Sequence, residues 1–316
     1  MNNLYMGLDV GVIYTKGIII DDKANILASA YIDTLGEPVR AAKKVIKDME
    51  KEIDLNKYRV VSLGVTGSAR KLVGSLLSAN TIRNEITSLV EGCVKLYPNV
   101  RTIMEIGGED SKTIILEDGI IKDYAICKYV SGSYVNYFTK MFGIDIKDVN
   151  DMAMKGKSRL DVLPKCMMFL ENDLANKMQS GYKKEDVLRN ISLGIARGYV
   201  NSFKDMINDG PIIFCGGVSR NKLVVNEIEK MLDCHVVVNR NSHIMRALGI
   251  AILAKKEGKY KEFDFNICNY KMDTKIHSCL KCNKRCEIVS IYRDDKLIDY
   301  WGNKCNDSVK EGNLVV

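Results

Sequence analysis

The chain has 316 residues, 46% of them apolar and 28% charged, a composition typical of ordinary globular proteins. This length favours two domains over one. The formal net charge is +7, but basic residues are interspersed with acidic ones along the sequence, which favours a solvated surface over a nucleic-acid-binding face. No apolar run approaches the roughly 20 residues that span a bilayer, and the N-terminus lacks a signal-peptide pattern. We therefore expect a cytoplasmic protein with neither nucleic acid nor membrane as a partner.

The first part of the chain predicts an α/β lobe in which two strands flank a glycine turn. A third strand, a helix, a buried strand and a second helix follow in that order. These elements are expected at 3–10, 15–22, 25–33, 38–53, 58–67 and 81–97.

The same order then starts again, which indicates a duplicated lobe. Strands are expected at 100–108, 111–119 and 120–126, helices from Ser131, Lys147, Cys166 and Lys184, and a strand at 210–219. Ser219 is the expected N-cap of a helix over 221–232, and a short strand and a closing helix are expected at 234–239 and 242–256. The predicted organisation is a lobe at 1–98 completed by the helix 243–256, a second lobe at 99–242, and a cysteine-rich tail at 257–316. A cleft is expected between the two lobes.

Three glycine turns are candidate phosphate sites, because glycine lets backbone N–H groups approach an anion closely. The first lies in "GLDVGVIYTKG" (7–17), the second in "EIGGEDSKTII" (105–115) and the third at Gly216 and Gly217. A carboxylate beside such a turn can hold Mg²⁺, usually through water. The candidate metal-holding acids are Asp9, Glu105 and Asp110. The candidate nucleotide ligands are Gly11, Thr15, Lys16, Gly107, Gly108, Gly216, Gly217 and Asn221.

With "LDVGVIYTKG", "MEIGGEDSK" and "IIFCGGVSRN" in this order, the chain resembles the acetate kinase/sugar kinase/Hsp70/actin superfamily. The resemblance implies an actin-like ATPase fold, an α/β architecture of two duplicated ribonuclease-H-like lobes that binds ATP or ADP at two phosphate turns and an adenosine turn. One difference is the first turn, where Val12 and Ile13 occupy positions at which the superfamily usually has hydroxyl residues. Backbone groups and Lys16 must then supply more of the phosphate binding.

Ten cysteines in a cytoplasmic chain point to metal or iron–sulfur ligation more than to disulfides. Cys93, Cys215 and Cys234 lie within apolar patterns and are most simply core residues. Cys127 and Cys166 precede predicted helices, where the helix dipole favours a thiolate. Spacing alone still favours a core role for these two as well.

Family resemblance changes that balance. "NEITSLVEGC", "EIGGEDSK", the isolated Cys127 and "KCMMFLENDLANKMQSGYKKEDVLRNI" together resemble the activators of 2-hydroxyacyl-CoA dehydratases, the benzoyl-CoA reductase-associated ATPases, over about residues 3 to 256. The resemblance implies that Cys127 and Cys166 from each of two subunits bind one [4Fe–4S] cluster in a homodimer. It also implies a ferredoxin or flavodoxin as electron donor and ATP-driven transfer of a low-potential electron.

The tail contains C-x2-C-x3-C and a later cysteine, namely Cys279, Cys282, Cys286 and Cys305. Two apolar stretches after Cys286 are expected to form a hairpin that brings the fourth cysteine back, and either zinc or a second iron–sulfur cluster suits this set. His277 and Cys268 are possible extra ligands. Such a tail resembles the cysteine-rich module of larger activase-like proteins. The electron acceptor is then a dehydratase, a benzoyl-CoA-type reductase or a double-cubane-cluster protein.

Two rival interpretations remain open. A small-molecule kinase, of a sugar or amino sugar, would use the same fold, but it needs a carboxylate base that we cannot identify between the first two turns. The other interpretation is a non-enzymatic regulator that has a zinc-binding tail and senses nucleotide. The iron content of the purified protein distinguishes the electron-transfer activator, which should contain iron, from the kinase and the regulator.

Overall fold

The computed structural model describes residues 1–160, 162, 167–207, 210–279 and 283–304. The chain forms two compact units. Unit 1 comprises Met1–Glu85 and Ile250–Val316, and unit 2 comprises Ile86–Gly249. The boundaries predicted from the sequence, at 98/99 and 256/257, stay predictions about how the chain divides into domains.

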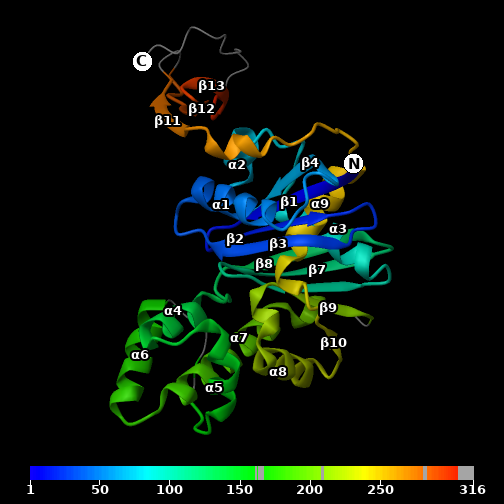
Figure 1. The fold of residues 1–316 in the computed structure, drawn as a ribbon. Coiled ribbons are helices and arrows are strands. Elements are labelled where there is room, and N and C mark those ends of the chain that lie inside the picture. Colours follow the sequence, from blue (N-terminus) through cyan, green and yellow to red (C-terminus); the bar gives the residue numbers. More distant parts are fainter. Residues whose placement is uncertain (161, 163–166, 208–209, 280–282, 305–316) are drawn as a thin grey trace. The chain divides into compact units, whose positions relative to one another are not determined.

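Unit 1 is built on a five-stranded sheet with the order β3-β2-β1-β4-β5 (Figure 1). Its first three strands are antiparallel neighbours, whereas β4 and β5 run parallel to β1. The strands are β1 (Asn2–Val10), β2 (Tyr14–Ile20), β3 (Ile26–Asp33), β4 (Tyr58–Thr66) and β5 (Thr81–Ile82). Helix α1 (Pro38–Glu50) buries Ala42, Val45, Ile46 and Met49 in the core, and this helical spacing is why the segment folds as an amphipathic helix.

Unit 2 repeats this sheet, with the order β10-β9-β6-β7-β8. The first three strands of the repeat are again antiparallel, and the last two run parallel to β6. The strands are β6 (Thr102–Ile106), β7 (Ser111–Glu117), β8 (Ile120–Cys127), β9 (Ile212–Cys215) and β10 (Val236–Val237). The predicted duplication of the α/β lobe is therefore confirmed at the level of strand order and direction.

Unit 2 places most of its helices between β8 and β9. They are α4 (Ser133–Phe142), α5 (Val149–Lys155), α6 (Met167–Gln179) and α7 (Lys184–Phe203), and α8 (Lys222–Leu232) follows β9. Short 3₁₀ turns lie at Ile146–Asp148, Lys204–Met206, Gly217–Arg220 and Ser242–Ile244. The buried rings of Phe138, Tyr199 and Phe214 belong to one core cluster that joins α4 and α7 to the sheet.

The predicted N-cap of α8 is wrong. The side chain of Asn221 accepts hydrogen bonds from the backbone N–H groups of Leu223 and Val224, which is the N-cap geometry. Ser219 instead donates to the carbonyl of Gly216, at 2.7 Å, inside the preceding 3₁₀ turn. The observed N-cap lies two residues after the predicted one, because this 3₁₀ turn precedes the start of the helix.

Two elements of the first half differ from the sequence prediction. The stretch 81–97 begins with the short strand β5, and α3 (Glu85–Leu96) starts only after it. Helix α2 (Arg70–Leu76) was not predicted at all, because its seven residues are too few to show a helical period. Helix α9 (Met245–Lys256) begins in unit 2 and continues into unit 1.

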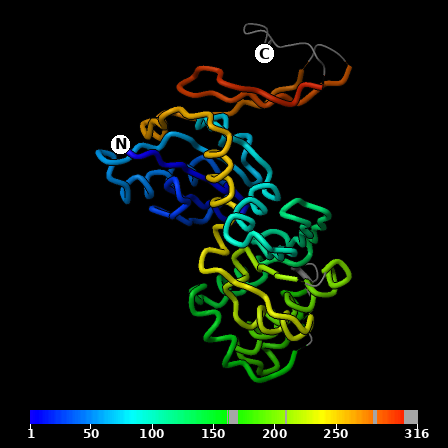
Figure 2. Tube along the Cα trace, turned by 90° about the vertical axis from the view of Figure 1, so that its right-hand side faces the viewer, coloured from blue at the N-terminus to red at the C-terminus, as the bar shows by residue number. Residues whose placement is uncertain are grey.

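The described part of the tail is a 3₁₀ turn, η5 (Phe265–Asn269), and an antiparallel three-stranded sheet, drawn as an elongated layer in Figure 2. The predicted hairpin is confirmed as β12 (Glu287–Arg293) and β13 (Lys296–Trp301), whereas β11 (Met272–Ser278), which contains His277, was not predicted. The guanidinium of Arg293 donates to the carbonyl of Leu76 at 2.6 Å and to the hydroxyl of Ser78 at 2.8 Å. The tail sheet is thereby tied to the C-terminal end of α2.

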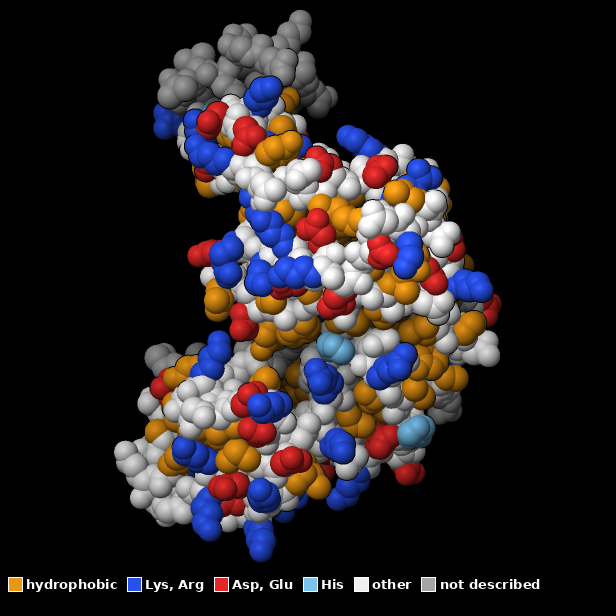
Figure 3. All heavy atoms as spheres, in the orientation of Figure 1, with side chains coloured by type: hydrophobic (Ala, Val, Ile, Leu, Met, Phe, Trp, Pro, Cys, Tyr) orange, Lys and Arg blue, Asp and Glu red, His pale blue; other side chains and the backbone are white. Residues whose placement is uncertain are grey.

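Positive and negative side chains are interspersed on the face shown in Figure 3, over elements of both units. This mixture follows the alternation of basic and acidic residues along the sequence. Among the helices that the structure describes, none combines the length and the apolar character that crossing a membrane requires.

Cys268, in η5, allows a test of whether this part of the tail packs into the core of unit 1. Its side chain is buried in the core of that unit, and burial raises the pKa of the thiol to about 11. An unfolded chain loses the same proton at about pH 8.5. The unfolded state therefore binds fewer protons as the pH rises towards 11, and the free energy of unfolding falls.

We expect Cys268→Ala to flatten this alkaline loss of stability, because alanine has no proton to retain. Urea unfolding of reduced protein, followed by circular dichroism at neutral and alkaline pH, measures the effect. The comparison uses only the change with pH, so the constant cost of the missing sulfur cancels. Equal pH dependence in the variant and the wild type would show that the thiol is not buried.

Candidate functional site

Two turns of the same geometry close the β1–β2 hairpin of unit 1 and the β6–β7 hairpin of unit 2. In the first, the N–H of Gly11 donates to the carbonyl of Tyr14 with an N···O distance of 3.0 Å. In the second, the N–H of Gly107 donates to the carbonyl of Asp110 at 2.9 Å. Each turn therefore presents two central residues, 12 and 13 or 108 and 109, between ends fixed by one backbone hydrogen bond.

A buried carboxylate and a lysine face each other beside each turn. Asp9 is opposite Lys16 on β1 and β2, with 3.4 Å between Oδ2 and Nζ. Glu105 is opposite Lys112 on β6 and β7, with 3.8 Å between Oε2 and Nζ. Asp9 is 1% exposed and Glu105 is 2% exposed. Opposite residues of antiparallel strands share a face of the sheet, so the same acid–lysine pair is built twice.

Two further charged side chains contact the acid–lysine pair beside the second turn. Lys112, itself 1% exposed, also contacts the carboxylate of Asp110. Arg246, on α9, places its Nε 2.6 Å from Oε1 of Glu105. Sequence reasoning missed both cations. Hairpin register could have identified Lys112, but Arg246 is 141 positions from Glu105 and has no motif around it.

The third turn also has a counterpart that sequence reasoning missed. Gly216 has φ +88°, and a Cβ there would lie 2.3 Å from the carbonyl oxygen of Ile106. Gly67 has φ +93°, and a Cβ there would lie 2.5 Å from the carbonyl oxygen of Val10 and 2.8 Å from Oδ1 of Asp9. Only glycine combines this backbone conformation with so close an approach. The repeated signal is a glycine that ends the strand parallel to the first strand of the hairpin.

The central residues of the two hairpin turns differ in chemistry. In the first turn the side chain of Val12 is 49% exposed, and Ile13 is half-buried. The second turn has Gly108 and the exposed Glu109 at these places. The two central residues of each turn have no hydroxyl group, so phosphate binding by these residues would use their backbone N–H groups.

Two predicted nucleotide ligands have structural hydrogen bonds in place of free side chains. Thr15 is fully buried, and its hydroxyl lies 2.9 Å from that of Thr34, which in turn donates to the carbonyl of Gly11 at 2.8 Å. Asn221 caps α8 and donates to the hydroxyl of a buried serine at 2.9 Å. These contacts hold the turns in shape, and a direct role in nucleotide binding stays a prediction for both residues.

Cys127 is the last residue of β8 and lies opposite Ser111, the first residue after the second turn. Its side chain is half-buried, and its Sγ is 3.6 Å from the hydroxyl of Ser202. Helix α4 begins at Ser133, close to the expected start at Ser131, so Cys127 precedes this helix as expected. The dipole effect is confined to the first turn of a helix and does not reach this thiol.

The cysteines expected in the core are placed as follows. Cys93 and Cys215 are fully buried, with their Sγ atoms 3.6 Å apart, so the prediction is confirmed for both. The hydrogen bond to Cys93 and burial raise the pKa of the Cys215 thiol well above its ordinary value. Cys234 is half-buried against the core of unit 2. Cys166 lies outside the described residues.

The tail places two of its four predicted ligands side by side. The N–H of Cys279 donates to the carbonyl of Cys286 at 2.7 Å, which continues the β11–β12 pairing. Cys286 is buried, and the N–H of Lys304 points at its Sγ with an N···S distance of 3.4 Å. Cys282 and Cys305 lie outside the described residues. Within the described ranges, no group of three or more His, Cys, Asp or Glu side chains is placed to hold a metal ion.

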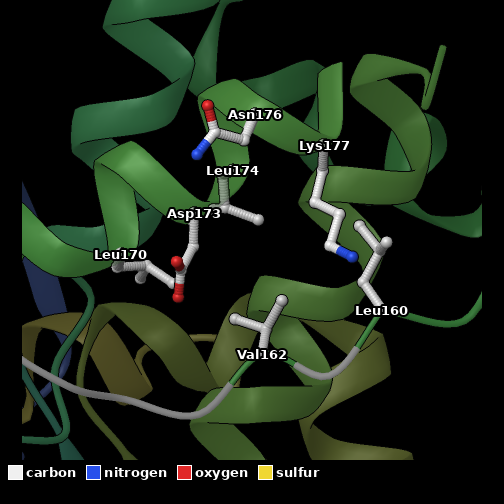
Figure 4. A pocket seen from close by; sticks show the side chains of 7 residues that line it. All are labelled: Leu160, Val162, Leu170, Asp173, Leu174, Asn176 and Lys177. Atoms are coloured by element: carbon white, nitrogen blue, oxygen red, sulfur yellow. The ribbon is translucent and has the colours of Figure 1, made fainter. Parts of the chain in front are cut away.

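A cavity of about 320 Å³ lies in unit 2 beside α6 (Figure 4). Four of its lining side chains are aliphatic and three are polar, and the set is Leu160, Val162, Leu170, Asp173, Leu174, Asn176 and Lys177. None of them belongs to a glycine turn or is a cysteine. The cavity is therefore separate from the candidate nucleotide ligands.

Two sheets of the same topology, each with a glycine turn at its first hairpin, define an actin-like ATPase fold. The activator of 2-hydroxyisocaproyl-CoA dehydratase from Clostridium difficile, solved with bound ADPNP, has this fold. It superposes with a TM-score of 0.73 over 81% of this chain and 96% of that chain, at 23% identity.

The BadF/BadG/BcrA/BcrD ATPase family matches residues 6–254, and the chain belongs to this family. The 2-hydroxyisocaproyl-CoA dehydratase activator of Clostridioides difficile is 24% identical over 258 residues, which cover 80% of this chain and 96% of that protein. The uncharacterized protein MJ0800 of Methanocaldococcus jannaschii is 28% identical over 79% of this chain. The present chain spans 61% of the length of MJ0800. The match to the family ends before the cysteine-rich tail begins.

The close approach at Gly216 predicts a large loss of stability for Gly216→Ala. The positive φ alone costs about 1–2 kcal/mol for an L-residue. The contact with the carbonyl of Ile106 adds overpacking, which typically costs about 1–3 kcal/mol. Urea unfolding measures the sum. Gly119→Ala is the matched control, since Gly119 has φ +78° but its Cβ would meet only ordinary contacts at 3.6 Å. Equal losses in the two variants would contradict the close approach.

Proposed function

We propose that this chain is an ATP-dependent electron-transfer activator. It passes a low-potential electron from a [4Fe–4S] cluster, bridging two identical subunits, to a partner enzyme. The observation that carries the proposal is the glycine turn with a buried acid–lysine pair, built twice in a chain of this ATPase family. The acceptor is a 2-hydroxyacyl-CoA dehydratase, a benzoyl-CoA-type reductase or a double-cubane-cluster protein.

The nucleotide part of the proposal rests on the glycine turns. Carboxylates fixed beside turns with available backbone N–H groups suit a magnesium–phosphate complex. Asp9, Glu105 and Asp110 are the proposed metal-holding acids, directly or through water. The remaining proposed ligands are Gly11, Thr15, Lys16, Gly107, Gly108, Gly216, Gly217 and Asn221. Mg²⁺ offsets phosphate charge when the γ-phosphate is transferred to water.

The redox part of the proposal rests on two cysteines. A [4Fe–4S] cluster takes four thiolates, and a homodimer supplies them as Cys127 and Cys166 from each chain. Cys127 suits this role because its thiol is at a strand end and only half-buried, at the margin of the core of unit 2. A ferredoxin or flavodoxin is the proposed electron donor, since the cluster must be reduced again after each transfer.

The tail is proposed to hold zinc or a second iron–sulfur cluster through Cys279, Cys282, Cys286 and Cys305. Support comes from the N–H of Lys304, because a backbone N–H directed at Sγ stabilises the thiolate form that a metal requires. Cys279 follows β11 and Cys286 precedes β12, so a metal bound to both would hold this end of the three-stranded sheet together. The opposite end of β12 is tied to α2 through Arg293.

ATP drives the transfer in this proposal only by binding one conformation better than another. A ligand shifts an equilibrium by no more than its difference in affinity for the two states. Binding and hydrolysis of ATP then alternate the preferred conformation, and the segment that ends in Cys127 belongs to the sheet that carries the second turn.

Anaerobic purification tests the proposal. The protein should be brown, contain about four irons per dimer from the shared cluster, and hydrolyse ATP. A colourless, iron-free protein that phosphorylates a sugar would instead establish the kinase. Zinc alone, with nucleotide binding but no hydrolysis, would establish the regulator.

Asp9→Asn tests the metal-holding role. We expect ATP hydrolysis to fall by at least about 100-fold, the typical loss when a group that stabilises the transition state is removed. Iron content should stay unchanged, because Asp9 lies in unit 1 and Cys127 in unit 2. A phosphate-release assay and iron analysis on the same sample provide both readouts. Asp118→Asn, at an exposed turn, is the matched control. Hydrolysis at the wild-type rate in Asp9→Asn would refute the assignment.

Cys127→Ser tests the shared cluster. We expect the iron of the bridging site, about four per dimer, to be lost while nucleotide affinity is retained. Iron and sulfide analysis with a nucleotide titration measures both, and comparison with the wild type removes any iron held by the tail. Cys234→Ser, another half-buried cysteine of unit 2, should leave the iron unchanged. Unchanged iron in Cys127→Ser would exclude this residue as a ligand.

A further inference from the structure

Thr66 is a buried polar residue beside the first acid–lysine pair. It is the last residue of β4, directly before Gly67, and its side chain is fully buried. Strand pairing places it opposite Asp9 on β1, whereas Lys16 faces Asp9 from β2 on the other side. Paired residues of neighbouring strands point to the same face of a sheet, so the hydroxyl, the carboxylate and the ammonium group belong to one row across unit 1.

The carboxylate of Asp9 is in close contact with the backbone that follows Thr66. A Cβ built on Gly67 would lie 2.8 Å from Oδ1 of Asp9. This contact joins the acid to the end of β4 as directly as strand pairing joins it to β2. A group that binds the carboxylate from this side therefore comes close to Thr66.

The hydroxyl of Thr66 has no hydrogen-bond partner among the residues that the structure describes. Burying a hydroxyl without such a bond is unfavourable. The hydroxyl of Ser62, on the same face of the same strand, donates to the carbonyl of Ala254 at 3.2 Å. Thr66 lacks an equivalent acceptor, and a group that binds next to it would supply the missing bond.

The second sheet shows the same position with a partner supplied by the protein. Cys215, the last residue of β9, lies opposite Glu105 as Thr66 lies opposite Asp9. Its Sγ is 3.6 Å from that of Cys93, on α3. The side chain beside the acid is therefore satisfied internally in unit 2, but not within the described part of unit 1. A hydroxyl is also a better hydrogen-bonding group than a thiol.

We propose that Thr66 is a positioning residue for magnesium and that its hydroxyl binds a water molecule on the ion held by Asp9. This inference rests on the proposed function, since it requires Asp9 to hold the metal. Mg²⁺ usually keeps several waters when a protein binds it, and a metal-bound water donates its hydrogen bonds outward. The hydroxyl oxygen of Thr66 can accept one of them without adding charge to the acid–lysine pair.

Thr66→Val replaces the hydroxyl by a methyl group of similar size, and its two expected effects have opposite signs. Without nucleotide, the melting temperature of the anaerobically purified protein should rise by about 1–3 °C, because a buried hydroxyl without a partner is removed. Binding of a non-hydrolysable ATP analogue is then measured by isothermal titration calorimetry, in Mg²⁺ and in EDTA. The gain in affinity due to Mg²⁺ should fall by about threefold to tenfold, the range of one hydrogen bond, while the affinity in EDTA stays unchanged.

Two further variants serve as controls. Thr102→Val removes another fully buried hydroxyl without a partner in the described chain, but Thr102 is the first residue of β6, at the far end of that strand from the second turn. Its melting temperature should rise in the same way, and its response to Mg²⁺ should not change. Thr66→Ser keeps the hydroxyl and should keep the wild-type response to Mg²⁺.

The outcomes separate this inference from the proposed function. A more stable Thr66→Val with a weakened response to Mg²⁺, and a normal response in Thr66→Ser and Thr102→Val, supports the inference. A less stable Thr66→Val, an unchanged response in it, or an equal loss in Thr66→Ser overturns the inference and leaves nucleotide binding standing. A wild-type protein that does not bind the analogue in either solution overturns both.

Discussion

The candidate site depends on a carboxylate held in the interior of a sheet by a lysine on the next strand. Burying one such charge alone would be costly, and a partner across the ladder offsets much of that cost. The hairpin places the pair in register without help from any other element, because strand pairing fixes which residues face each other. The requirement that a buried acid faces a cation on the next strand is met twice, by Asp9 with Lys16 and by Glu105 with Lys112.

A glycine packs directly against the backbone at the end of the first strand of each hairpin, and this close contact is needed to bury the acid–lysine pair there. Gly67 and Gly216 follow the strands that run parallel to β1 and β6, and any side chain on them would collide with the backbone of Val10 or Ile106. The carboxylate of Asp9 lies against Gly67 in the same way. The acid in one strand and the glycine that follows another strand are far apart in the sequence, but each depends on the other in the folded structure.

Much of this organisation could be predicted from the sequence, and the failures have physical causes. Strand patterns and glycine turns located the strands of both sheets except β5, whose two residues fell within a predicted helix. The N-cap went to Asn221 because a 3₁₀ turn, which has no sequence signature, precedes α8. Helix α4 starts at Ser133, two residues after the expected start at Ser131. Arg246 could not be predicted from the sequence, because it contacts Glu105 only in the folded structure and no local sequence pattern indicates a contact between residues so far apart.

The two halves differ at the carbonyl of the first residue of each hairpin turn, although the first turn is also held by a backbone hydrogen bond from the N–H of Thr34 to the carbonyl of Ile13 at 2.8 Å. In unit 1 the carbonyl of Gly11 accepts from the hydroxyl of Thr34, a buried side chain. In unit 2 the carbonyl of Gly107 accepts from the backbone N–H of Gly132. A Cβ on Gly132 would lie 3.2 Å from that carbonyl oxygen, so the two backbones are in direct contact. A shift of the second turn that keeps this hydrogen bond would move Gly132 with it, because a backbone-to-backbone bond has no side-chain rotamer that could absorb the shift. If the second turn binds phosphate as proposed, coupling to Cys127 would be carried inside unit 2 through this backbone contact.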